Sequence, residues 1–193
     1  MLSDLIKAIE DQLQHKPNIV VGISGFGGAG KTTLADKLRD HFGVADQQVV
    51  RLDNFFAEKH ANKLVFEDYD WPVITQVLRD VKAGKPLAYT GRGFFGEPVV
   101  VSQPLPSVVI VEGVRLFRPE LMSLFDVSVW IDITPELATE RGEARDRASG
   151  ADEQHIARWR TEWLPKDQQY FETYKPAELV DMLFGQALGG LSS

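Results

Sequence analysis

The sequence predicts an α/β fold with a mainly parallel β-sheet. Two observations predict it: short apolar runs alternate with helical patterns along the chain, and the run at 18–24 passes through a glycine-rich stretch directly into a helical pattern. A length of 193 residues suits a single domain over 1–193. Within this domain we expect a small helical lid at about 141–158 and a flexible tail at about 185–193.

The first half of the chain is predicted to contain three helices and two strands. Acidic residues in the first helical pattern argue against a signal peptide. In the second pattern Leu34, Leu38 and Phe42 share one helical face, and Pro72 suits the first turn of the third. The expected elements are a helix at 3–14, a strand at 18–24, a helix at 31–42, a strand at 48–53 and, after a loop over 54–70, a helix at 72–82.

The second half continues the alternation after a small β-rich insertion. Two short segments at 87–89 and 99–101 flank residues 91–98, which predicts a hairpin or a protruding loop. Thr134 suits a helix N-cap with Pro135 in the first turn. The remaining expected elements are a strand at 107–111, a short helix at 119–124, a strand at 127–133, a helix to about 147, a helical stretch at 153–173 and a strand at 179–184.

The glycine-rich stretch fits the phosphate-loop pattern G-x-x-x-x-G-K-[ST]. Its residues are Gly25, Phe26, Gly27, Gly28, Ala29, Gly30, Lys31, Thr32 and Thr33. Strand, loop and helix in this order are the context that the motif requires, because loop amides and a helix N-terminus together hold a polyphosphate. Lys31 would reach the β- and γ-phosphates, and Thr32 would ligate Mg²⁺. The alternative is a flexible glycine turn, but a chance match to the pattern arises only about once in a hundred chains of this length. The motif predicts a nucleotide-binding P-loop NTPase fold, a three-layer sandwich.

Two acidic residues follow strands that should end near this loop. Asp53 closes the predicted strand at 48–53, and Glu112 follows four β-branched apolar residues. The carboxyl ends of parallel strands face the ligand crevice, so both carboxylates are candidates for holding Mg²⁺. Asp53 could also accept the proton of a substrate hydroxyl during phosphoryl transfer. A turn-forming aspartate and an exposed strand-end glutamate are the alternatives.

Basic residues mark the predicted lid. Arg141 and Arg145 share a face of the helix after Thr134, and Arg147 lies at its end. Such a row suits a lid that neutralises charge on a transferring phosphoryl group. Acids on the same helix leave open a merely solvated, ion-paired surface. These acids are Glu140, Glu143 and Asp146, and Arg158 and Arg160 are weaker lid candidates.

Aromatic and polar residues provide candidates for binding the acceptor. Tyr69 and Asp70 could stack on a ring and bond hydroxyl groups, although Asp70 could instead cap the following helix. Tyr89, Arg92 and Phe94 could form an acceptor pocket, although aromatic residues of hairpins often fold back on the surface.

Bulk properties restrict the partners. A net charge of −7 argues against nonspecific binding to nucleic acid or anionic membranes, and no apolar run reaches the roughly 20 residues of a membrane span. The absence of cysteine excludes disulfides and thiolate metal sites and fits a cytoplasmic location. Exposed aromatic residues would suit a homodimer as well as a substrate pocket.

With these motifs in place, the chain resembles the uridine kinase branch of the P-loop kinases, to which phosphoribulokinase and pantothenate kinase are related. The resemblance covers about residues 18–184. Its specific parts are the phosphate loop, residues 51–56, residues 108–113 and the arginine-bearing helix, together with Tyr69-Asp70-Trp71 and a tail from Trp159 to Asp181.

The resemblance implies roles for several of these residues. Asp53 would be the catalytic base, and Thr32, Asp53 and Glu112 would organise Mg²⁺. Arginines of the 141–147 helix would lie over the phosphates, and Asp70 and Tyr89 would lie near an acceptor nucleoside. The family's Tyr-Asp-Phe-x-x-His element corresponds here to residues 89–94, where Phe94 replaces the histidine, so uridine is not assured as the acceptor.

The predicted function is an ATP- and Mg²⁺-dependent kinase that phosphorylates a small-molecule hydroxyl, most simply the 5′-hydroxyl of a nucleoside. A pantothenate-like alcohol, a sugar or another nucleoside is the alternative acceptor, and an ATP-binding regulatory module without transfer activity is the alternative class. A regulatory GTPase is disfavoured, because Asn62-Lys63 is followed by Leu64 and Val65 rather than by a guanine-reading aspartate element.

Overall fold

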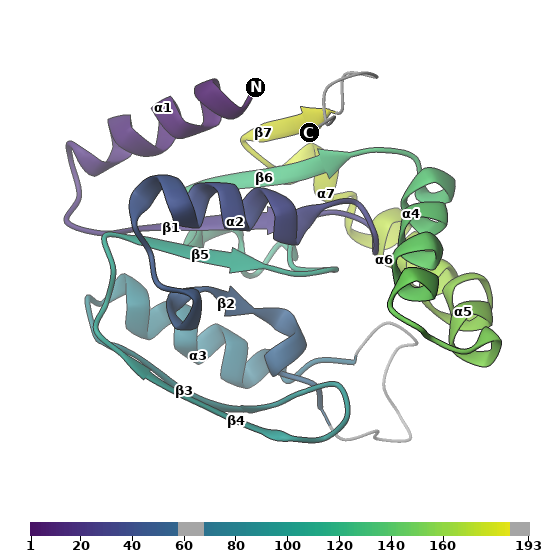
Figure 1. The fold of residues 1–193 in the computed structure, drawn as a ribbon. Coiled ribbons are helices and arrows are strands. Elements are labelled where there is room, and N and C mark those ends of the chain that lie inside the picture. The colour runs from purple at the N-terminus through teal and green to yellow at the C-terminus, as the bar shows by residue number, and fades with distance from the viewer. Residues whose placement is uncertain (58–67, 186–193) are drawn as a thin grey trace.

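The computed structural model describes residues 1–57 and 68–185. Within these ranges it contains a five-stranded parallel sheet of order β2-β5-β1-β6-β7 and a separate antiparallel hairpin, β3-β4 (Figure 1). The strands are β1 (Ile19–Ser24), β2 (Val50–Arg51), β3 (Leu87–Arg92), β4 (Pro98–Gln103), β5 (Val108–Glu112), β6 (Val127–Asp132) and β7 (Met182–Gly185).

Helices cover both faces of the sheet. They are α1 (Leu2–Leu13), α2 (Lys31–Phe42), α3 (Trp71–Lys82), α4 (Pro135–Ala148), α5 (Glu153–Arg158), α6 (Leu164–Tyr174) and α7 (Pro176–Leu179). Short 3₁₀ turns lie at Asp46–Gln48, Leu52–Asn54 and Met122–Leu124, and a π-helical turn lies at Trp159–Trp163. No helix in the described ranges has the length and apolar character needed to cross a membrane.

The central strands β1 and β5 are apolar along most of their length because both of their faces are buried. In β1, Val20 joins the core that α3 covers, whereas Ile19 and Val21 join the core under α1 and α2. The same alternation continues in β5, where Val109 and Ile110 enter opposite cores. Burial on both faces is typical of parallel sheets. The predicted three-layer α/β fold is confirmed.

The register brings the carboxyl ends of three strands together. Ile23 of β1 and Arg51 of β2 both pair with Glu112 of β5. The phosphate loop after β1, the 3₁₀ turn containing Asp53 and the end of β5 therefore meet at one edge of the sheet. Helices α4, α5 and α6 stand at this same edge (Figure 1).

Most predicted elements are confirmed, with four differences. The short helix expected at 119–124 is reduced to the 3₁₀ turn at Met122–Leu124. The strand expected at 48–53 is shorter, so Asp53 lies in a 3₁₀ turn just beyond it. The strand expected at 179–184 begins at Met182, because α7 precedes it. The hairpin expected around 91–98 is present. Part of the loop predicted at 54–70 and most of the predicted tail lie outside the described residues.

The fourth difference is that the single helical stretch expected at 153–173 is divided. The π-helical turn Trp159–Trp163 separates α5 from α6. Pro165 provides the physical reason, since it has no amide hydrogen and its ring clashes with the carbonyl four residues earlier. Turns of this kind are frequent at functional sites.

Candidate active site

The phosphate loop packs tightly against α4. Gly28 has a φ of +82°, and a Cβ atom there would lie 2.0 Å from the carbonyl oxygen of Ala138. Gly30 has a φ of +100° at the start of α2. Backbone conformation thus requires glycine at Gly28 and Gly30, and at Gly28 the close approach of the α4 backbone requires it as well.

Lys31 is folded into the loop. Its ammonium group donates hydrogen bonds to the carbonyl oxygens of Gly25 and Phe26, at 3.2 and 2.8 Å. Burial lowers the pKa of Lys31, and the carboxylates of Glu112, Asp167 and Asp53 partly oppose this effect. A buried cation bonded only to neutral carbonyls would gain a stronger partner from a polyphosphate.

Thr32 and Glu112 form an oxygen-rich corner beside Lys31. The Thr32 hydroxyl donates to Glu112 Oε1 at 3.3 Å. Burial and the nearby Asp53 carboxylate raise the pKa of Glu112, whereas Lys31, Arg51 and the Thr32 hydroxyl act to lower it. In the described ranges no three His, Asp or Glu side chains cluster as a protein-only metal site. One or two carboxylates and a hydroxyl beside a phosphate loop instead fit Mg²⁺, which is usually completed by substrate phosphates and water.

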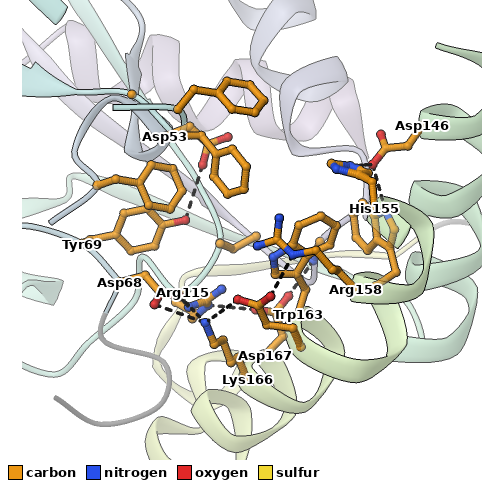
Figure 2. A pocket seen from close by; sticks show the side chains of 18 of the residues that line it. Asp53, Asp68, Tyr69, Arg115, Asp146, His155, Arg158, Trp163, Lys166 and Asp167 are labelled. Carbon is orange, nitrogen blue, oxygen red and sulfur yellow. Dashed lines mark hydrogen bonds and ion pairs between the residues drawn. The ribbon is translucent and has the colours of Figure 1, made fainter. Parts of the chain in front are cut away.

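Asp53 faces the cleft with a hydrogen-bonded partner. The hydroxyl of the buried Tyr69 donates to Asp53 Oδ1 at 3.4 Å (Figure 2). Burial and the Asp53 carboxylate raise the pKa of Tyr69 well above its usual value of 10.0. Tyr69 therefore remains a protonated donor, and within residues 1–57 and 68–185 Asp53 Oδ2 has no hydrogen-bond partner.

A cleft of about 910 Å³ lies between the β3-β4 hairpin, the phosphate loop and the α4–α6 helices. Among the predicted site residues, Gly27, Asp53, Tyr69, Arg92, Phe94 and Arg145 line it. The remaining lining residues are Phe56, Ala57, Asp68, Gly93, Phe95, Gly96, Val114, Arg115, Asp146, His155, Arg158, Trp159, Glu162, Trp163, Lys166 and Asp167.

A network of ion pairs, which the sequence did not reveal, crosses the floor of this cleft (Figure 2). Arg115 Nε donates to Asp167 at 2.9 Å and its Nη1 donates to Asp68 at 2.8 Å. Lys166 lies between Asp68 and Glu162, at 3.2 and 3.1 Å. Arg115 follows β5 by three residues, so its place just after a predicted strand, which identified Glu112 as a candidate, could have identified Arg115 as well. Asp167 gives no such signal, because it lies within a helix.

The α4 arginines differ in their surroundings. Arg145 lines the cleft, lies 5.7 Å from the centre of the Trp159 ring and pairs with Asp146 at 2.8 Å. Arg141 is exposed and is not among the residues lining the cleft. Ion pairing on this helix, the alternative weighed from the sequence, is thus present at Arg145. The roles of both arginines at the phosphates remain predictions.

Two predicted acceptor residues lie behind the cleft wall. The Asp70 carboxylate caps α3 by accepting from the Val73 amide at 3.3 Å. Tyr89 is buried, its ring 4.7 Å from that of Phe55, and its hydroxyl accepts from Asn54 at 3.2 Å. Neither residue lines the cleft, so a contact with the acceptor remains a prediction for both.

Known proteins resemble this chain in sequence and in fold. A uridine kinase of Geobacillus kaustophilus (strain HTA426) is 31% identical over 147 residues, covering 68% of each chain. Uridine-cytidine kinase A of Dictyostelium discoideum is 26% identical over 144 residues, covering 69% of this chain and 29% of its own. No family model matches the chain.

Solved structures share the fold. A protein from Silicibacter sp. TM1040, assigned provisionally as a fructose transport system kinase, superposes with a TM-score of 0.72 at 20% identity, covering 90% of this chain and 95% of its own. A protein from Bacillus stearothermophilus, described as a possible uridine kinase, has a TM-score of 0.61 at 20% identity, covering 94% and 99%. These neighbours confirm the P-loop kinase architecture.

Proposed function

Because this chain belongs to the uridine kinase family of P-loop kinases, we propose that it transfers the γ-phosphate of ATP to a hydroxyl group of a nucleoside-like acceptor. Membership of the family makes it a small-molecule kinase, that is, a phosphotransferase with a hydroxyl acceptor. The observation that carries the proposal is that Asp53 and the phosphate loop open onto the same cleft. A base and a phosphate cradle on facing walls are what in-line transfer to a hydroxyl requires.

In the proposed reaction, the chain positions two substrates and moves one proton. The loop amides and Lys31 hold the polyphosphate, and Lys31 exchanges its carbonyl partners for phosphate oxygens. Asp53 accepts the acceptor hydroxyl's proton as that oxygen forms a bond to the γ-phosphorus. The bond from the γ-phosphorus to the bridging oxygen breaks, which leaves ADP and a phosphomonoester. Tyr69, a persistent donor, keeps Asp53 oriented.

Mg²⁺ is proposed as the metal cofactor, with Thr32, Asp53 and Glu112 around it. When bound, it neutralises charge on the β- and γ-phosphates. Arg145 on α4, with Arg141 one turn away, is proposed to add positive charge when the 141–158 lid closes over the phosphates.

The aromatic wall beside Asp53 supports an acceptor with a flat ring. The Phe56 ring lies 5.0 Å from Tyr69 and 5.1 Å from Phe94, measured between ring centres. Phe94 stands where the family's element carries a histidine, so stacking would replace a hydrogen bond to the base. This favours a nucleoside without assuring uridine, and sugars and pantothenate-like alcohols remain alternative acceptors.

The test is phosphate transfer from ATP to a panel of nucleosides, sugars and pantothenate-like alcohols, by wild type and by Asp53→Asn. We expect transfer to at least one nucleoside, and a loss of at least a hundredfold in kcat for Asp53→Asn with ATP affinity retained. Near-normal turnover of that variant would exclude Asp53 as the base. ATP binding without transfer to any acceptor would instead favour the regulatory-module alternative.

A further inference from the structure

We propose that Arg115 and Asp167 form a positioning pair that sets the separation between the phosphate loop and the wall carrying Asp53. The proposal rests on the proposed function, because it assigns to the pair the alignment of donor and acceptor in the same cleft. Neither residue is proposed to touch the reacting atoms.

The Asp167 end of the pair holds the phosphate loop. Asp167 Oδ2 accepts a hydrogen bond from the Gly27 amide at 2.9 Å, although 140 positions separate the two residues. Its other oxygen, Oδ1, accepts from Arg115 Nε at 2.9 Å. One carboxylate of α6 therefore connects the loop backbone to Arg115, in the segment that follows β5.

The Arg115 end is fixed by its backbone and by burial. Arg115 has a φ of +60°, a left-handed conformation that non-glycine residues adopt rarely and at some cost, and such strain often accompanies function. Its side chain is only 6% exposed, and that of Asp167 is 7% exposed. Burial opposes the charge, but the carboxylates of Asp167 and Asp68 raise the pKa of Arg115, so the guanidinium stays charged.

The pair reaches Asp53 through Tyr69. The Arg115 guanidinium lies 5.7 Å from the centre of the Tyr69 ring, within the range of a cation–π contact. The Tyr69 hydroxyl donates to Asp53. Four contacts thus lead from the Gly27 amide to the proposed base: Gly27 to Asp167, Asp167 to Arg115, Arg115 to the Tyr69 ring, and the Tyr69 hydroxyl to Asp53.

A purely stabilising role explains these features less well. A buried ion pair often contributes no more stability than apolar residues of similar volume, because both ions must be desolvated. Alignment, in contrast, has a large effect on rate, since a misplacement of about 1 Å can reduce transfer about a hundredfold.

The experiment compares Asp167→Asn, Arg115→Met and the double variant with Asp126→Asn. Asp126 is a matched control. Its side chain is 2% exposed, it accepts a hydrogen bond from the Val20 amide and pairs with Lys82, both at 2.8 Å, and it does not line the cleft.

We expect the two cleft variants, Asp167→Asn and Arg115→Met, each to lose at least tenfold in kcat, with the KM for ATP and for the acceptor changed less than threefold. The double variant should lose no more than the more severe single variant, because the residues act as one unit. Asp126→Asn should lower the melting temperature while keeping kcat within twofold.

A second readout needs no substrate. Amide hydrogen exchange of residues 25–31 should accelerate in Asp167→Asn and Arg115→Met but not in Asp126→Asn. Unchanged loop protection in both cleft variants would overturn the proposal, as would kcat within twofold of an active wild type. A wild type that transfers phosphate to no acceptor would overturn the proposed function instead, and loop protection would then still decide the role of the pair.

Discussion

At the scale of single residues, Trp159 joins α4 to the phosphate loop. A Cβ atom at Gly142 of α4 would lie 2.4 Å from its indole ring, and one at Gly27 would lie 2.9 Å from it. The indole nitrogen donates to Asp146 at 2.8 Å. The indole ring therefore packs closely against two glycines, Gly142 and Gly27, and its nitrogen is fixed by the carboxylate of Asp146.

We predict that Gly142→Ala destabilises the protein although it improves helix propensity. Alanine within a helix gains about 1 kcal/mol over glycine, but overpacking against a buried ring costs about 1–3 kcal/mol. We expect a net loss of about 1 kcal/mol, measured by urea unfolding. The control is Ala144→Gly at an exposed position of α4, which should lose about 1 kcal/mol through propensity alone. A Gly142→Ala variant more stable than wild type would show that the indole moves at little cost.

Single residues also show which parts of the site the sequence makes predictable. Lys31 and Thr32 follow from a local motif whose spacing itself encodes the geometry. Asp53 and Glu112 follow from their place at strand ends. Arg115 and Asp167, in contrast, are 52 positions apart and meet only because α6 packs across the cleft. No local pattern encodes that contact, so the network needed the folded chain.

At the scale of elements, capping of α3 provides a test that separates stability from binding. Asp70 caps the helix, and Tyr69 beside it lines the cleft, so the two neighbours face different surroundings. The sequence allowed Asp70 either a capping or an acceptor-binding role. The cap is observed, whereas the acceptor contact is still a prediction.

We predict that Asp70→Ala lowers stability by about 1 kcal/mol and that Asp70→Asn lowers it by less than half of that, because asparagine caps nearly as well as aspartate. Urea unfolding measures both changes. Because Asp70 lies outside the cleft lining, we expect the KM for the acceptor to stay within threefold in both variants. A KM that rises at least tenfold in Asp70→Asn, with stability retained, would instead establish the contact with the acceptor.

Elements were predictable where periodicity and terminal residues agreed. The helix at 72–82 combines an apolar face with a capping residue and a proline at its first turn, and α4 has the capping Thr134 followed by Pro135; both helices are observed within a residue of their predicted ends. The division of the 153–173 stretch was missed, although Pro165 marks it, because the helical pattern continues on both sides. The proline was thus the local signal for the division, and the helical pattern around it hid that signal.

At the scale of the whole molecule, the strand order brings remote segments to one cleft. The sequence predicts parallel strands but not their order, which depends on how α2, α3 and the crossover segments pack on the two faces. With β1 between β5 and β6, the phosphate loop emerges beside Glu112. The β3-β4 hairpin and the α4–α6 helices both contribute residues that line the cleft. A ligand in this cleft would contact segments from the whole chain.

We therefore predict that ATP with Mg²⁺ stabilises the entire fold. At a ligand concentration about 100 times Kd, linkage adds about 2.7 kcal/mol to the free energy of unfolding. For a domain of this size each kcal/mol corresponds to about 2–4 °C, so the melting temperature should rise by about 5–10 °C.

At the same ATP concentration Lys31→Met should lose most of this shift, since it removes the cation that holds the phosphates, whereas Asp126→Asn should keep it. An equal shift in Lys31→Met would mean that ATP stabilises the fold from outside the phosphate loop. Scanning calorimetry at several ATP concentrations measures the shift and, from its concentration dependence, the affinity.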